Sequence, residues 1–159
     1  PFLYFWFRYV FPYRSMVQMY SSREIFNLYV KPSWDIFLGL RFEAFVKRAA
    51  LSVLKEKNIF VKEAGAYWQN KTQKGPGVQI DLVLDRADGD THICECKWTA
   101  QPVGLGVYKE LLNKISLYPH QTQTVHPTIF SLSKPSKALL PLIKEGQLWF
   151  YTLEDLYHV

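Results

Sequence analysis

The stretch VQIDLVLDRADGDTHICECKW, residues 78–98, decides the fold predicted for this chain of 159 residues. Two runs rich in apolar residues, 78–85 and 91–98, flank the short polar sequence Ala87-Asp88-Gly89. Apolar runs of this length around a glycine-containing turn predict two antiparallel strands joined by a tight loop. These two strands are expected to form the centre of the fold.

The length of the loop sets which residues lie opposite one another. A three-residue loop with Gly89 in a left-handed conformation places Asp81 opposite Glu95. A two-residue loop would pair Asp81 with Cys96 and send the two carboxylates to opposite faces. We predict the three-residue loop, with Val83 opposite Ile93.

The other elements follow from hydrophobic periodicity and from glycine and proline. Strands are expected at 59–66, 128–132 and 147–151, and helices at 33–57, 105–117 and 136–144. Residues 2–11 fit a short helix or a strand, and residues 16–29 a further helix. The order of helix, three strands, helix and strand predicts an α/β fold with one mixed central sheet flanked by helices. The core stripe expected on the long helix is Phe42, Phe45, Ala49 and Val53.

Composition excludes several classes of protein. The chain is 48% hydrophobic, which excludes disorder, and its net charge of +5 is compatible with an anionic partner. The aromatic segment 2–11 is too short to span a bilayer and lacks the features of a signal peptide. Cys94 and Cys96 are expected to be buried, reduced thiols of a cytoplasmic protein, because residues two apart on a strand form only a strained disulfide.

The two strands carry a set of side chains suited to phosphodiester chemistry. Asp81 and Glu95, with the backbone carbonyl of Cys96, offer the hard oxygen ligands that Mg²⁺ or Mn²⁺ prefers. Lys97, two residues after Glu95, can orient a water or stabilise charge on a phosphate. Glu43 on the long helix is the candidate third acid, on a stripe of small residues through which a helix can approach a sheet.

Each of these residues also has a plainer interpretation. The two strand carboxylates could be solvent-facing residues paired with nearby lysines. Glu43 has an alternative role as the i,i+4 partner of Lys47. Trp68 and Trp98 are expected to be packing residues rather than platforms for base stacking.

Four stretches of the chain carry a family resemblance: PFLYFWFRYV (1–10), PYRS (12–15), GLRFE (39–43) and ECKW (95–98). They resemble the C-terminal domain of unknown function attached to archaeal-type AAA+ ATPases, which is also found in bacteria. The element order resembles the restriction-endonuclease-like αβββαβ core of the PD-(D/E)XK nuclease superfamily. The proline of that motif is absent here, because Ile80 precedes Asp81.

The resemblance implies a function and a set of partners. It implies that Asp81, Glu95 and Lys97 are the nuclease triad, that Glu43 is the acid of the first helix, and that the substrate is DNA. It also implies an upstream ATPase module in the full-length chain, and residues 1–159 contain no P-loop motif of their own. The alternative function is a non-catalytic domain for nucleic-acid docking, protein docking or oligomerisation.

The expected organisation is an aromatic linker with helices at 1–32, the tail of an upstream winged-helix or ATPase region, followed by the nuclease-like domain at 33–159. The aromatic segment is a candidate contact between two copies of the chain. Four lysines are candidates for phosphate contacts, although ordinary solubility also explains each one: Lys71, Lys74, Lys109 and Lys114.

Overall fold

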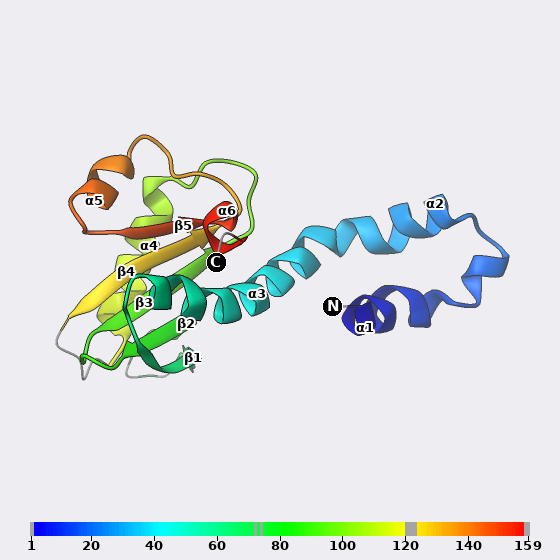
Figure 1. Cartoon of the computed structure of the whole chain (residues 1–159). Helices are drawn as coiled ribbons and strands as arrows, with labels where there is room; N and C mark the ends of the chain where they lie inside the picture. The colour runs from blue at the N-terminus through cyan, green and yellow to red at the C-terminus, as the bar shows by residue number, and fades with distance from the viewer. Residues whose placement is uncertain (1, 72, 74, 120–123, 158–159) are drawn as a thin grey trace. The chain divides into compact units, whose positions relative to one another are not determined.

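The computed structural model describes residues 2–71, 73, 75–119 and 124–157 (Figure 1). The chain forms two compact units, Pro1–Arg41 and Phe42–Val159, and each is described by itself. The division falls inside one long helix, α3, which spans Trp34–Glu56. Within the described residues, no helix is both long enough and apolar enough to cross a bilayer.

The first unit is a series of short helical segments before α3. They are α1 (Phe2–Phe5), η1 (Trp6–Val10), η2 (Phe11–Tyr13), η3 (Met16–Gln18), α2 (Ser22–Ile25), η4 (Phe26–Val30) and η5 (Lys31–Ser33). The single helix predicted over 16–29 is wrong. The helical structure is interrupted before Ser21. The Ser21 hydroxyl accepts from the backbone N–H of Glu24, and the Glu24 carboxylate accepts from the backbone N–H of Ser21. This capping box starts a new helix at Ser22.

A small aromatic core holds the first unit together. Tyr9, Val30 and Phe37 are buried in it. The Tyr9 hydroxyl lies 3.0 Å from the carbonyl oxygen of Ser33, to which it donates, and 2.8 Å from the Ser33 hydroxyl. The aromatic opening of the chain is therefore helical, and one side of it packs against the start of α3.

The second unit contains a five-stranded mixed sheet. Its elements after α3 are β1 (Val61–Gln69), β2 (Val78–Arg86), β3 (Thr91–Lys97), α4 (Leu105–Leu117), β4 (Val125–Ser131), α5 (Leu140–Lys144), β5 (Trp149–Thr152) and α6 (Leu153–Tyr157). The strands lie in the order β1-β2-β3-β4-β5; the first three are antiparallel, and β4 and β5 continue parallel to β3. The predicted fold class, a mixed sheet flanked by helices in αβββαβ order, is confirmed. The predicted helix at 136–144 is shorter and begins at Leu140.

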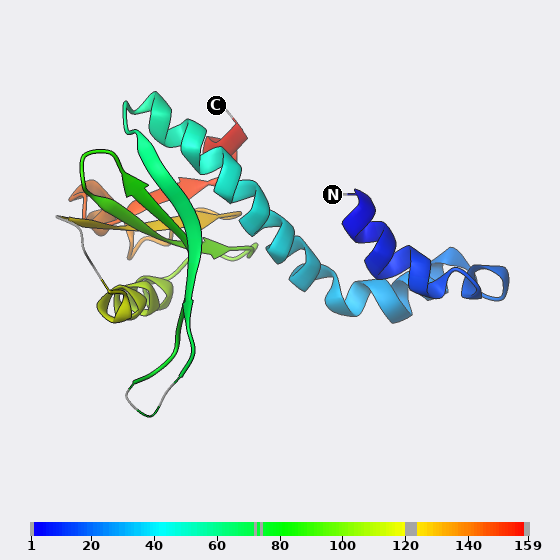
Figure 2. The ribbon, with the colours of Figure 1, turned by 90° about the horizontal axis from the view of Figure 1, so that it is seen from below.

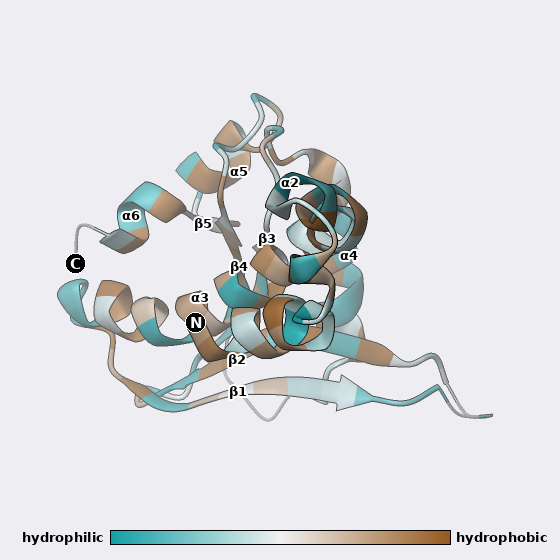
Figure 3. Cartoon of the chain, turned by 90° about the vertical axis from the view of Figure 1, so that its right-hand side faces the viewer, coloured by the Kyte–Doolittle hydropathy of each residue, from teal (hydrophilic) through white to brown (hydrophobic). Residues whose placement is uncertain are grey.

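Helices cover both faces of the sheet (Figures 1 and 2). The part of α3 after Arg41 packs with α6 on one face, where Leu82, Leu84 and Cys94 are buried. On the other face α4 and α5 enclose a second core that includes Ile80 and Ile93. β1 is one of the two edge strands, and most of its residues are hydrophilic or intermediate in hydropathy (Figure 3).

The core stripe of α3 differs from the predicted one. Val46 and Ala50 have no exposed surface, whereas Phe45 and Ala49 are only partly buried. The small side chains of this stripe allow the helix backbone to lie close to the sheet. The same stripe continues to Glu43, so close packing of α3 also sets the position of that carboxylate.

The predicted loop between β2 and β3 is confirmed. Val83 lies opposite Ile93, and the backbone N–H of Arg86 donates to the carbonyl of Asp90 at 2.8 Å. Gly89 has a φ of +95°, a region that favours glycine. Turn chemistry therefore fixes the register of this hairpin.

A bulge in β2 changes the faces predicted for that strand. Gly65 lies opposite Val83 and Tyr67 opposite Ile80, so two steps along β1 match three along β2. The extra residue falls at 81–82. As a result Ile80 shares a core with Val83, rather than with Leu82 and Leu84 as alternation predicted.

The close approach of α3 gives a testable consequence. Replacing Ala50 with leucine inserts three carbons into a filled contact, so Ala50→Leu should lower the free energy of unfolding by about 1–3 kcal/mol. Ala44→Leu, at an exposed position of the same helix, should change it by less than about 0.5 kcal/mol. Urea denaturation followed by circular dichroism measures both, and equal effects would contradict the packing described.

Candidate functional site

The candidate site lies where β2 and β3 separate. Their pairing ends at Leu82 and Cys94, although β3 continues beside β4 to Lys97. The next residues beyond the last pair are Asp81 on β2 and Glu95 on β3. Here the backbone N–H of Cys96 has a side chain as its acceptor in place of a strand carbonyl. It donates to Oδ2 of Asp81 at 2.8 Å.

Glu95 forms the centre of the charged cluster. Only 4% of its surface is exposed. Its Oε1 lies 2.7 Å from Nζ of Lys97, and its Oε2 lies 2.6 Å from Nζ of Lys114. Both carboxylate oxygens therefore accept from an ammonium group, which offsets the cost of burying the charge. Lys97 comes from the same strand and Lys114 from α4, so the two lysines approach from different elements.

The third acid, Glu43, faces the same cluster from α3. Burial raises the pKa of Glu43, and the negative charges of Asp81 and Glu95 raise it further. The two cluster lysines oppose this shift. Within the described residues no ion pair joins Glu43 to Lys47, so the alternative surface pair on α3 does not form.

The pKa values show a site with excess negative charge. Burial raises the pKa of Asp81, as does the charge of Glu95, although the hydrogen bond from Cys96 acts in the opposite direction. Burial alone would lower the pKa of Lys97, but the bond to Glu95 and the neighbouring carboxylates outweigh it, and the pKa is raised. The three carboxylates interact electrostatically with one another and with the two lysines, so an additional positive charge would be stabilised there.

The four candidate phosphate-binding lysines have different environments. Lys114 belongs to the charged cluster itself. Lys71 and Lys109 are exposed, and Lys74 lies outside the described residues. The direct contact of Lys114 with Glu95 was missed from the sequence, because the two residues are 19 positions apart and only the packing of α4 brings them together. Amphipathic periodicity of α4, with Leu111 and Ile115 inward, was the available signal.

The two tryptophans in question have opposite environments. Trp98 packs against Phe42 with ring centroids 5.7 Å apart, as predicted. Trp68 is 72% exposed, so its prediction as a packing residue is wrong. Cys94 and Cys96 are buried free thiols beside Asp81, and burial raises the pKa of both.

A divalent cation is compatible with these residues. In the described part of the chain no three His, Cys, Asp or Glu side chains are close enough to form a complete cage. Mg²⁺ does not need one, since it is commonly bound through one or two carboxylates, waters and substrate phosphates. Asp81 and Glu95 provide that number of carboxylates, and the raised pKa of Asp81 is what a nearby cation would reverse.

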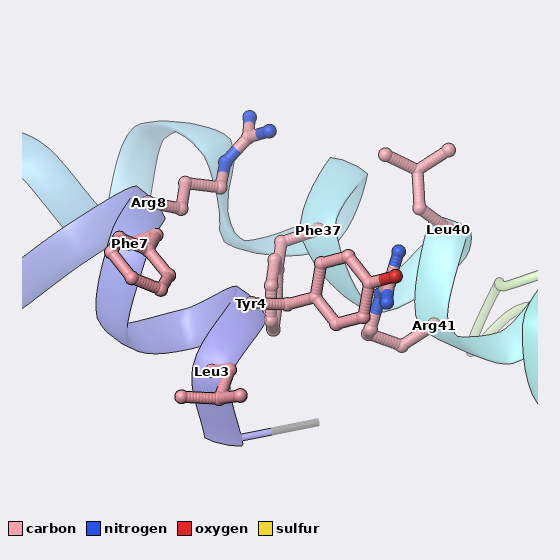
Figure 4. Close-up of a pocket in the computed structure, with 7 residues that line it drawn as sticks. All are labelled: Leu3, Tyr4, Phe7, Arg8, Phe37, Leu40 and Arg41. Carbon is pink, nitrogen blue, oxygen red and sulfur yellow. The ribbon is translucent and has the colours of Figure 1, made fainter.

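The first unit has a separate cavity of about 640 Å³, shown in Figure 4. Exposed rings from α1 and η1 line it together with residues of α3. The Arg41 guanidinium lies 4.0 Å from the centre of the Tyr4 ring, a cation–π contact, and its Nε has no partner within the described residues. This aromatic surface coincides with the segment predicted to contact another copy of the chain.

Comparison with known families gives one match. Residues 6–114 match DUF234, described as archaea bacterial proteins of unknown function. The chain belongs to this family. The match covers most of the aromatic first unit and all of the charged cluster of the second. None of the curated proteins compared with this DUF234 chain matches it.

Three solved structures are similar to the chain, and the first two support the fold. The protein of unknown function AF1548 is 20% identical, with a TM-score of 0.52 over 73% of this chain and 65% of that one. Protein VC1899 from Vibrio cholerae is 13% identical, with a TM-score of 0.50 over 73% of this chain and 30% of that one. A repair endonuclease from Pyrococcus abyssi is 15% identical, with a TM-score of 0.42 over 68% of this chain and 46% of that one. The DUF234 chain thus spans less than two thirds of each of these proteins.

The raised pKa of Asp81 predicts how stability depends on pH. The folded protein holds the Asp81 proton more tightly than the unfolded chain does. The free energy of unfolding therefore falls as pH rises from the ordinary carboxyl range through the raised pKa, and it stays lower above that pKa. Asp81→Asn keeps an oxygen that can accept from Cys96 but removes the charge. At about pH 8 this variant should be more stable than the wild type by on the order of 1 kcal/mol.

Urea denaturation at about pH 4 and about pH 8 tests this expectation, because the difference should shrink at the lower pH. Asp88→Asn is the control. Arg86 lowers the pKa of the exposed Asp88 carboxyl, so its neutralisation should not stabilise the protein at neutral pH. An Asp81→Asn variant no more stable than the wild type at about pH 8 would contradict the excess of negative charge.

Proposed function

We propose that this chain is a nuclease-like domain that hydrolyses phosphodiester bonds in DNA with Mg²⁺ or Mn²⁺. The observation that supports the proposal most strongly is the convergence of three carboxylates and two lysines from four elements where β2 and β3 separate. Excess negative charge in a partly buried site favours a cation, and ammonium groups beside it favour a phosphate.

Each residue has a separate role in this proposal. Asp81, Glu95 and the backbone carbonyl of Cys96 would hold the cation. When bound, the cation lowers the pKa of a coordinated water and stabilises negative charge on the phosphate. Lys97 orients the attacking water or stabilises charge on the phosphate, and it is a catalytic residue in this scheme. Glu43, with its raised pKa, is suited to holding a proton near the reacting atoms.

Lys114 is a positioning residue in this proposal. Its ammonium group holds Oε2 of Glu95 at 2.6 Å, which fixes the orientation of that carboxylate relative to Lys97. A carboxylate held at both oxygens has little rotational freedom, so the side chains around it are preorganised.

The proposed setting follows the family resemblance. The domain would act in the cytoplasm as the C-terminal part of an AAA+-type ATPase, which would direct it to DNA. Lys71 and Lys109 are exposed and would contribute phosphate contacts. The aromatic surface of the first unit would bind the upstream ATPase module or a second copy of the chain.

One observation favours a non-catalytic alternative. Both oxygens of Glu95 are already satisfied by lysines, so this carboxylate needs no bound cation. A docking domain for DNA or for the ATPase would need no more than this. The two functions differ in whether DNA is cut.

Cleavage assays decide between them. Supercoiled and linear DNA would be incubated with the wild type and Mg²⁺, Mn²⁺ or a chelator. Cutting should require the cation, and Glu95→Gln and Lys97→Ala should each reduce its rate by at least about 100-fold. Lys137→Ala and Glu154→Gln, at exposed positions outside the cluster, should cut at the wild-type rate.

Other outcomes have clear meanings. Binding of DNA without cutting, under every metal condition, would overturn the nuclease proposal and favour the docking domain. Cutting that survives in both cluster variants would place the reaction elsewhere in the chain or in a contaminant.

The role of Lys114 has its own test. Lys114→Gln should slow cutting by about 10-fold or more, because Glu95 loses one of its two fixed partners. Lys109→Gln, five residues earlier on the exposed side of α4, should leave the rate at saturating DNA unchanged. It should lower the slope of log Kd against log salt by about 1. A saturating rate that is unchanged in Lys114→Gln would remove Lys114 from the site.

A further inference from the structure

The hairpin of β1 and β2 has features that the nuclease proposal does not use. Its two arms continue together past the rest of the sheet (Figure 2). Residues 66–79 contain two lysines and no acidic residue, whereas the next loop, DRADGD at 85–90, contains three aspartates. The hairpin therefore has a local positive charge, although the nearby cluster has an excess of negative charge.

Trp68 is the most exposed of the five tryptophans, at 72%. It lies opposite Gln79, two positions along β2 from Asp81. Its neighbour Tyr67 packs into the core on the α4 side, so alternation along β1 directs Trp68 to the α3 side of the sheet. From strand spacings, its Cα lies about 8–9 Å from that of Asp81.

A cavity of about 520 Å³ lies beside the exposed ring. Trp68, Asn70 and Lys71 from one arm and Gln79 from the other are among the residues that line it. An aromatic face, amide groups and an ammonium group are the chemistry that binds a base, its edge and its phosphate.

The two arms of the hairpin approach each other closely at Gly77. A Cβ on Gly77 would lie 2.8 Å from the backbone nitrogen of Lys71 and 2.9 Å from the carbonyl oxygen of Gln69. Only glycine lets the two arms come this close. Because the arms are this close, Gln79 on one arm lies opposite Trp68 on the other.

We propose that this cavity binds an unpaired nucleotide of DNA, with its base stacked on Trp68, adjacent to the site of cutting. The location beside the cutting site rests on the proposed nuclease function, while the stacking itself does not. The substrate class becomes DNA with a single-stranded segment, because bases in an intact duplex are already stacked and cannot cover the indole.

Binding measurements test this without any cutting. Fluorescence anisotropy with the full chain in chelator would compare labelled oligothymidylate of about 12 nucleotides with an abasic oligonucleotide of equal length. The two probes carry the same phosphates and differ only in their bases. The wild type should bind the oligothymidylate more tightly by about 5- to 100-fold, and Trp68→Ala should abolish that difference.

Three controls separate stacking from other effects. Trp68→Phe should retain most of the preference, because a ring remains. Phe60→Ala removes another exposed ring near the opposite end of β1 and should change nothing. The salt dependence of binding should be the same in Trp68→Ala and the wild type, since the phosphate contacts are unaltered.

The outcomes distinguish this inference from the nuclease proposal. If Trp68→Ala weakens both probes equally, or neither probe, base stacking is overturned whatever the cleavage assays show. If the wild type binds an intact duplex as tightly as the oligothymidylate, the single-stranded substrate class is overturned. A Trp68-dependent preference for bases in a chain that never cuts DNA would support the nucleotide site and reject only the nuclease.

Discussion

The hydrogen bond from the backbone N–H of Cys96 to Asp81 is the interaction on which the site depends. At that position a regular sheet would use a backbone carbonyl of β2. The bulge at 81–82 moves that backbone away, and the Asp81 carboxylate takes its place. The bond lets two neighbouring strands separate without leaving a buried donor unsatisfied, and the opening between them is where the other charged groups meet.

The groups at this opening lower the free energy of unfolding. Asp81 and Glu43 are partly buried acids whose pKa values are raised first by burial and then by other acids. Replacing such groups with apolar residues commonly stabilises a protein. A cluster that opposes folding in this way is typical of a functional site. The two lysines reduce the cost, but they offset fewer charges than the three carboxylates carry.

Local chemistry explains which features could be predicted from the sequence. The loop at 87–89 was predictable because Gly89 and its neighbours determine the turn without help from distant residues. The bulge was not, since it exists only in the pairing of β2 with β1. The contact of Lys114 with Glu95 and the exposure of Trp68 were not predictable for a similar reason. The contact of Lys114 depends on how α4 packs, and the exposure of Trp68 depends on how far the hairpin extends beyond the sheet.

The two faces of the sheet contribute different groups to the opening. The helix on one face supplies an acidic residue, Glu43, and the helix on the other supplies a positively charged residue, Lys114. Each is held by its own hydrophobic core, so the charges meet only because the strands between them separate. A continuous sheet would keep the two groups in different compartments. The bulge therefore does more than redirect Asp81: it converts two independent cores into the walls of one polar site.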